Sequence, residues 1–190
     1  MSRMPLSRLA LAALCLLAAS SLGAQRAVPR VRVVLPAYRT PIALDTIMQR
    51  YIFSESPGRV WSAASKVFYD LKISTDMRDS LQGIVGITHL LKSNSFGGHP
   101  MSRLLNCGYG ITGPNADNFR INLALVAFVV PVDSVKTELG VAFIGSGMDM
   151  RGSSSDPVAC APSGVMEASL AEKVGKILNP AIPILKKPGT

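Results

Sequence analysis

The segment from Phe119 to Val130 most constrains the fold, because an extended strand formed from it would be apolar on both faces. A strand that is buried on both sides lies inside a sheet and is covered twice. A run of about a dozen residues is too short to cross a membrane as a helix. We therefore expect helices on one face of the sheet and a second cover on the other: an N-terminal arm, a partner chain or a ligand.

Helical spacing predicts two long helices that pack on this sheet. The first begins at Ser56-Pro57, where Ser56 can cap the helix and Pro57 suits its first position. Its apolar stripe contains Val60, Trp61, Ala64, Val67, Phe68 and Leu71, of which we expect Trp61 and Phe68 to be core anchors. The second helix is expected from Ser163 to Leu178, with Ser163 as its cap.

Further strands are predicted at residues 45–53, 81–91 and 135–146, and turns or loops at 75–80, 93–100, 111–117 and 147–164. Residues 103–109 are compatible with a short strand or a helical turn. The order strand, helix, several strands, helix predicts an α+β fold. We expect an antiparallel sheet of about four to five strands with both helices on one face, in a single domain from 42 to 180.

Residues 1–24 are typical of a secretory signal peptide. Arg3 and Arg8 precede an uncharged apolar run, and small residues follow it up to Ala24. We expect cleavage near Gly23 or Ala24 and a periplasmic or secreted mature chain. Cys15 lies inside the apolar run rather than at its end, so it does not fit a lipidation site and would leave with the signal peptide.

The net charge of +8 lies outside the expected domain. A basic, proline-containing arm (residues 25–41) carries Arg30, Arg32 and Arg39, and the tail at 181–190 carries two lysines. Basic and acidic residues are equal in number between 42 and 180, whereas a nucleic-acid-binding domain would carry its positive charge on the fold. The sequence therefore predicts no nucleic-acid partner. The arginines are candidate contacts to an acidic protein or an anionic surface.

Two cysteines, Cys107 and Cys160, remain after the predicted cleavage. In an oxidising compartment such a pair most often forms a disulfide. The alternative is a nucleophilic Cys107 activated by His99, which would require the two side chains to lie within hydrogen-bond reach. No metal-ligand spacing and no nucleotide-binding loop is found, so no cofactor is predicted.

The residues Arg59-Val-Trp61, Leu71-Lys-Ile73, Asp79 and Gly83 form a pattern similar to the helix-grip domains of the BamC outer-membrane assembly lipoprotein and related envelope domains. The resemblance covers a short stretch and implies a strand–helix–strands–helix module with a protein-binding role. This chain differs from that family in having no lipidation cysteine at a suitable position, a single module and the additional pair Cys107 and Cys160.

The leading hypothesis is an exported, non-enzymatic envelope protein that binds another protein or a surface through the arm and the second sheet face. Deletion of residues 25–41 would then abolish partner capture without unfolding the domain. One alternative is a carrier of a small apolar ligand or lipid, with a cavity between helix and sheet. Another is a secreted hydrolase that uses loop carboxylates such as Asp76 and Asp79, or Asp149 and Asp156.

Overall fold

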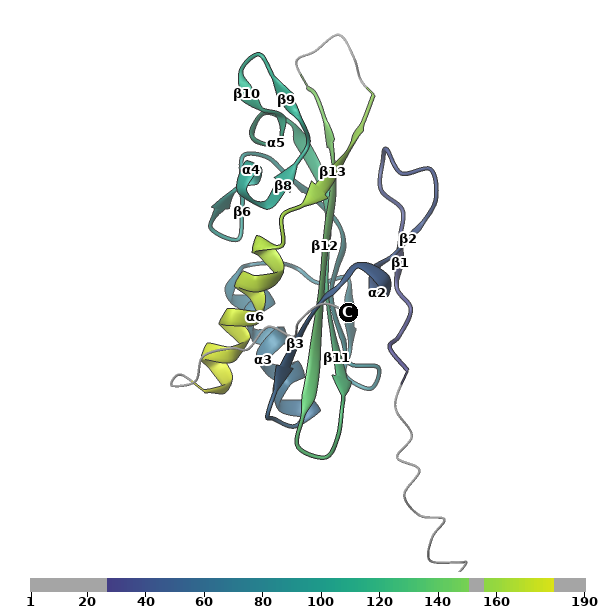
Figure 1. The fold of residues 1–190 in the computed structure, drawn as a ribbon, viewed down its shortest axis with the longest axis vertical. Helices are drawn as coiled ribbons and strands as arrows, with labels where there is room; N and C mark the ends of the chain where they lie inside the picture. Colours follow the sequence, from purple (N-terminus) through teal and green to yellow (C-terminus); the bar gives the residue numbers. More distant parts are fainter. Residues whose placement is uncertain (1–26, 151–155, 180–190) are drawn as a thin grey trace, which may run out of the picture.

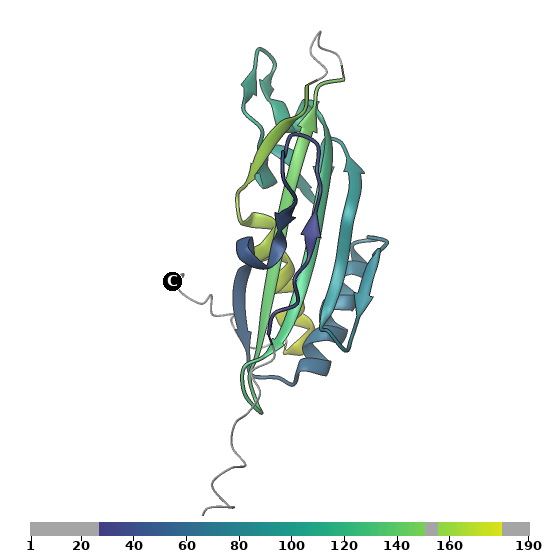
Figure 2. The ribbon, with the colours of Figure 1, turned by 90° about the vertical axis from the view of Figure 1, so that its right-hand side faces the viewer.

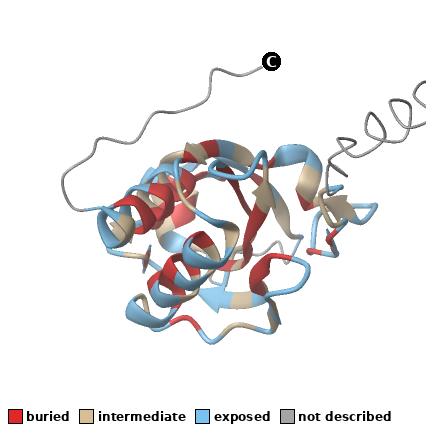
Figure 3. Cartoon of the chain, turned by 90° about the horizontal axis from the view of Figure 1, so that it is seen from below, coloured by how far each residue is buried: buried red, intermediate tan, exposed pale blue. Residues whose placement is uncertain are grey.

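The computed structural model describes residues 27–150 and 156–179 (Figure 1). The predicted signal peptide and the tail at 181–190 lie outside these residues. The α+β class is confirmed: a central antiparallel sheet has two long helices on one of its faces (Figures 1 and 3).

The central sheet is organised around β11 (Arg120–Pro131) and β12 (Thr137–Met148), which pair along their whole lengths. The sheet continues from β11 to β5 (Ile84–Lys92) and the edge strand β4 (Met77–Asp79). On its other side, β12 pairs with β3 (Gln49–Phe53) over one half and with β13 (Val158–Pro162) over the other. β13 pairs in turn with β8 (Leu105–Asn106).

The expected count of four to five strands is wrong, because the described part of the chain places seven strands in this sheet and contains five helices. The additional strands β4, β8 and β13 are two to five residues long. They arise in segments predicted as a turn, left undecided or predicted as a loop. Strands of this length show too few alternations to be recognised in sequence, and their pairing partners lie far away in the chain.

Both long helices form where helical spacing predicts them, as α3 (Pro57–Asp70) and α6 (Val165–Leu178). Ser56 is the N-cap residue of α3, although its side chain makes no capping hydrogen bond. The N-cap residue of α6 is Gly164, but the hydroxyl of Ser163 still accepts a hydrogen bond from the backbone N–H of Val165, the first helical residue, at 3.3 Å. The same hydroxyl donates to the backbone oxygen of Arg103 at 2.7 Å. Ser56 thus marks a helix start without supplying a side-chain bond, whereas Ser163 bonds the first turn of α6 from one position before the cap.

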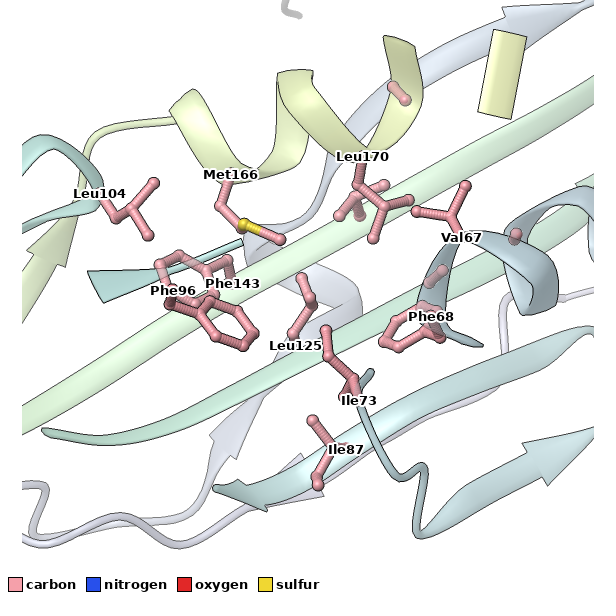
Figure 4. Packing of buried hydrophobic residues seen from close by; sticks show 14 of the residues in the cluster. Val67, Phe68, Ile73, Ile87, Phe96, Leu104, Leu125, Phe143, Met166 and Leu170 are labelled. Carbon is pink, nitrogen blue, oxygen red and sulfur yellow. The ribbon is translucent and has the colours of Figure 1, made fainter. Parts of the chain in front are cut away.

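A continuous apolar core fills the layer between these helices and the sheet (Figure 4). Phe68 and Leu170 enter it from the helices, and Leu125 and Phe143 from the two central strands. Phe68 is a core anchor as expected. Trp61 is only partly buried at the margin of the core, where its indole N–H donates to the backbone oxygen of Ile84 at 3.2 Å.

The predicted strand at 45–53 begins too early. Residues 44–47 form a helical turn, α2 (Leu44–Ile47), and the strand β3 starts only at Gln49. The hydroxyl of Thr46 donates to the backbone oxygen of Ala43 at 2.7 Å, a local bond that competes with strand pairing. A strand running through Ile47 would place it on the same face as the buried Tyr51 and Phe53, but Ile47 is 40% exposed.

Short elements also occupy the loop and turn segments at the upper end of Figure 1. They are the hairpin β6 (Ser95–Phe96) and β7 (His99–Pro100), the hairpin β9 (Tyr109–Gly110) and β10 (Gly113–Pro114), and the helical turns α4 (Met101–Leu104) and α5 (Asn115–Asn118). Phe96 stacks on Phe143 with 6.1 Å between ring centroids, so the first hairpin closes one end of the helix-side core.

The second face of the sheet is covered by the arm. Strand β1 (Arg32–Val33) of the arm pairs with β2 (Ile42–Ala43), which directly follows the arm. This hairpin lies over the central strands on the side away from α3 and α6 (Figures 1 and 2). A second core forms there, in which Val31, Val33, Leu35 and Leu44 pack with Ala124, Val126 and Phe128. Among the three covers considered, the described residues thus place the arm on this face.

Candidate functional site

The arm alternates between buried and exposed side chains. Val31, Val33 and Leu35 are buried against the sheet. Arg30 and Arg32, the two neighbours of Val31, are exposed to solvent. Arg39 is exposed in the turn that connects β1 to β2. Because successive residues of an extended chain face opposite sides, the burial of the valines presents Arg30 and Arg32 outward.

Few polar contacts hold the arm on the sheet. The hydroxyl of Tyr38 lies 3.3 Å from the backbone oxygen of Gly145 and 3.5 Å from that of Cys160. Burial raises the pKa of Tyr38 above its usual value, so this hydroxyl keeps its proton. Within the arm and the adjoining α2, the backbone N–H of Leu44 donates to the oxygen of Val31 at 2.8 Å. Apolar contact therefore contributes most of the attachment.

The arginines Arg30, Arg32 and Arg39 form what we call the arginine row. None of the three makes an ion pair with any residue that the structure describes. Residues 27–43 contain no aspartate or glutamate, so the local potential along the arm is positive. The arginine row thus combines exposed guanidinium groups with a backbone that is held in place by buried neighbours.

The two cysteines do form the expected disulfide, with 4.3 Å between the Cα atoms of Cys107 and Cys160. The bond joins the segment after β8 to strand β13, and Cys160 lies opposite Gly145 of β12. It therefore links the upper end of the molecule to the central sheet. The alternative of a nucleophilic Cys107 paired with His99 is wrong, because the Cys107 sulfur is already bonded.

Two of the loop carboxylates considered for a hydrolase have structural roles. Asp76 accepts hydrogen bonds from the backbone N–H and the hydroxyl of Thr88, at 2.9 and 2.6 Å to its Oδ2. Asp79 accepts from the backbone N–H groups of Leu81 and Gln82, both at 2.8 Å. Asp149 lies at the end of β12, and Asp156 lies before β13.

Sequence patterns did not reveal two buried glutamates near the sheet edge formed by β3. Glu138 accepts a hydrogen bond from Arg50 at 2.6 Å, and Glu167 lies on the sheet-facing side of α6. Burial, with a further contribution from the charge of Glu167, raises the pKa of Tyr51 to about 12. In the sequence, their burial could have been suspected only from a charged residue at an inward-facing position of a predicted strand or helix.

The described residues contain no cluster of three or more His, Cys, Asp or Glu side chains that could hold a metal ion. No helix in the described part of the chain is long and apolar enough to cross a membrane. No protein-family model, no curated protein and no solved structure matches this chain. The resemblance to helix-grip envelope domains therefore remains an expectation.

Proposed function

We propose that this chain is an exported, non-enzymatic module that binds an acidic partner protein through the arginine row. The observation that carries the proposal is that Arg30, Arg32 and Arg39 are exposed and lack an ion-pair partner among the described residues. Arginine is enriched at protein interfaces because its planar guanidinium group can form paired hydrogen bonds with a carboxylate. A partner with carboxylates spaced along an exposed strand would match this arrangement.

The packing of the arm supports this assignment. Val31 and Val33 are buried directly beside Arg30 and Arg32, so the backbone at these two arginines is held in place before a partner arrives. Ordering a segment in advance reduces the entropy lost on association, which increases affinity for a given set of contacts. An arm that was free in solution would bind the same carboxylates less tightly.

Export is the second part of the proposal. Disulfides persist mainly in oxidising compartments, and the bond between Cys107 and Cys160 is therefore consistent with a periplasmic or extracellular location. The signal-like pattern of residues 1–24 supports the same conclusion.

The carrier hypothesis receives less support from the packing. Its cavity was expected between the helices and the sheet, and large buried side chains from α3, α6 and the central strands occupy that layer (Figure 4). The arm and its buried valines likewise occupy the apolar second face.

Cross-linking in the cell envelope tests the proposal. We expect the wild-type chain to capture an acidic protein, and the triple variant Arg30→Glu, Arg32→Glu, Arg39→Glu to lose that capture. The matched control is Lys92→Glu, Lys136→Glu, Lys173→Glu, which makes the same charge change at exposed positions outside the arm. Equal capture by the triple variant would reject the proposal. So would binding to phosphatidylglycerol vesicles without any captured protein, which would assign the arginine row to a lipid surface.

A further inference from the structure

We propose that a groove between α3 and the edge strand β4 binds an extended, acidic peptide segment of a partner protein. This site lies on the helix side of the sheet, whereas the arm covers the other side (Figure 1). It therefore does not depend on the arginine row, and a protein with both sites could hold two partners or two parts of one partner.

The groove consists of two adjoining hollows. One has a volume of about 630 Å³, with Phe68, Ile73 and Val85 among its apolar lining residues. The other has a volume of about 390 Å³ and includes Trp61. Both hollows are lined by Ser65, Tyr69 and Arg78, so they form one continuous surface, which we call the helix–edge groove.

Strand β4 makes this groove accessible to an extended chain. It is the terminal strand of the sheet and pairs with β5 on one side. Arg78 lies directly opposite Val85, so both side chains share the sheet face that is turned toward α3. A peptide added beside β4 would place every second side chain toward the groove. Because β4 has only three residues, side-chain contacts must supply much of the affinity.

The groove brings together the residue types that most often dominate binding energy, namely tryptophan, tyrosine and arginine. The guanidinium carbon of Arg78 lies 5.3 Å from the centre of the Trp61 ring, within the range of a cation–π interaction. The indole of Trp61 is held by its hydrogen bond to Ile84, so this pair is positioned in advance. Tyr69 is 81% exposed and lies outside the core between the helices and the sheet, so it offers a large apolar contact to a ligand.

The charges of the groove select for acidic ligands. Lys72 and Arg78 are exposed and make no ion pair with any described residue. Lys66 and Asp70 also line the groove, but they pair with each other at 3.1 Å and their charges offset. The remaining positive charge complements glutamate or aspartate side chains.

Trp61 is the single tryptophan of the chain, so its fluorescence reports on this groove alone. We would titrate the purified protein with a pool of octapeptides in which glutamate alternates with Val, Leu, Phe or Ile. The second pool has lysine in place of each glutamate. We expect a saturable change in Trp61 emission with the glutamate pool and none with the lysine pool.

The double variant Lys72→Gln, Arg78→Gln should bind the glutamate pool at least about tenfold more weakly than wild type does. Calorimetry provides a second measurement of the affinity. The matched control Lys173→Gln, Lys176→Gln on α6 should bind like wild type, and so should the arginine-row triple variant. The proposal is rejected if the glutamate pool gives no saturable change, if the lysine pool binds as well, or if the double variant binds undiminished. None of these results affects the arginine row, whose test is cross-linking.

Discussion

Gly83 occupies a position in the turn between β4 and β5 that other residues would strain. Its backbone has φ = +72°, in the left-handed region that favours glycine. Its carbonyl oxygen accepts a hydrogen bond from the backbone N–H of Val129 at 2.7 Å, which ties the turn to β11. A Cβ atom at this position would lie only 2.3 Å from the backbone oxygen of Val129. Glycine is thus required here both by the positive φ angle and by the close approach of the Val129 backbone.

We predict that Gly83→Ala lowers the free energy of unfolding by about 2–5 kcal/mol, because backbone strain and a clash with another strand both contribute. Urea denaturation would measure the change. The matched control is Gly98→Ala, where φ is +87° but a Cβ would meet nothing within 4 Å. It should cost only about 1–2 kcal/mol, the cost of the backbone conformation. Equal costs for the two variants would show that the close approach of Val129 is unimportant.

The arm is an element whose stability comes from the sheet it covers. Its two-residue strand β1 pairs with β2, which follows the arm, while its buried side chains pack on β11 and β12. A two-stranded hairpin of this size is not stable alone in water. Removing residues 25–41 would expose Phe128 and its neighbours, so the packing argues against the expectation that the domain tolerates this deletion.

We predict that Leu35→Ala lowers the free energy of unfolding by about 2–5 kcal/mol, because Leu35 is 1% exposed in the second core, between the arm and the sheet. The neighbouring Val34 is 60% exposed, and Val34→Ala should change stability by no more than about 0.5 kcal/mol. Urea denaturation would measure both, and hydrogen exchange at the Leu44 amide would report opening of the arm. Similar effects of the two substitutions would mean that the arm is not packed as described.

For the whole molecule, the disulfide is the strongest long-range constraint in the described chain. It joins residues 53 positions apart and connects the short elements of the upper end to the central sheet. Cross-linking a loop of this length stabilises the fold mainly by reducing the entropy of the unfolded chain.

We predict that the variant Cys107→Ala, Cys160→Ala lowers the free energy of unfolding by about 4 kcal/mol, the value expected for a loop of about fifty residues. Thermal and urea unfolding of the oxidised protein and of the variant would measure it. Wild type reduced with dithiothreitol is the matched control and should resemble the variant. An unchanged midpoint on reduction would contradict a stabilising role for the bond.

Helices and strands were predicted correctly from the sequence where the pattern of apolar residues lies within one segment. The stripe through Val67 and Phe68 marked α3, and the doubly apolar run of β11 implied a central strand covered twice. Prediction failed where the pattern was short or interrupted, as at Ile47 and in the strands β4, β8 and β13. The burial of Glu138 and the contact between Arg78 and Trp61 also escaped detection, because each depends on residues that are distant in sequence.

The amino-acid sequence by itself determined the two long helices, the central strands and the pairing of two cysteines, because periodicity and composition within each segment favour those structures. Only the tertiary structure decided which of three possible covers lies on the second sheet face, and that the arginines of the arm face outward as a consequence. It also decided that a tryptophan, a tyrosine and an arginine line one groove. These outcomes depend on which distant surfaces bury one another, and no local pattern specifies that choice.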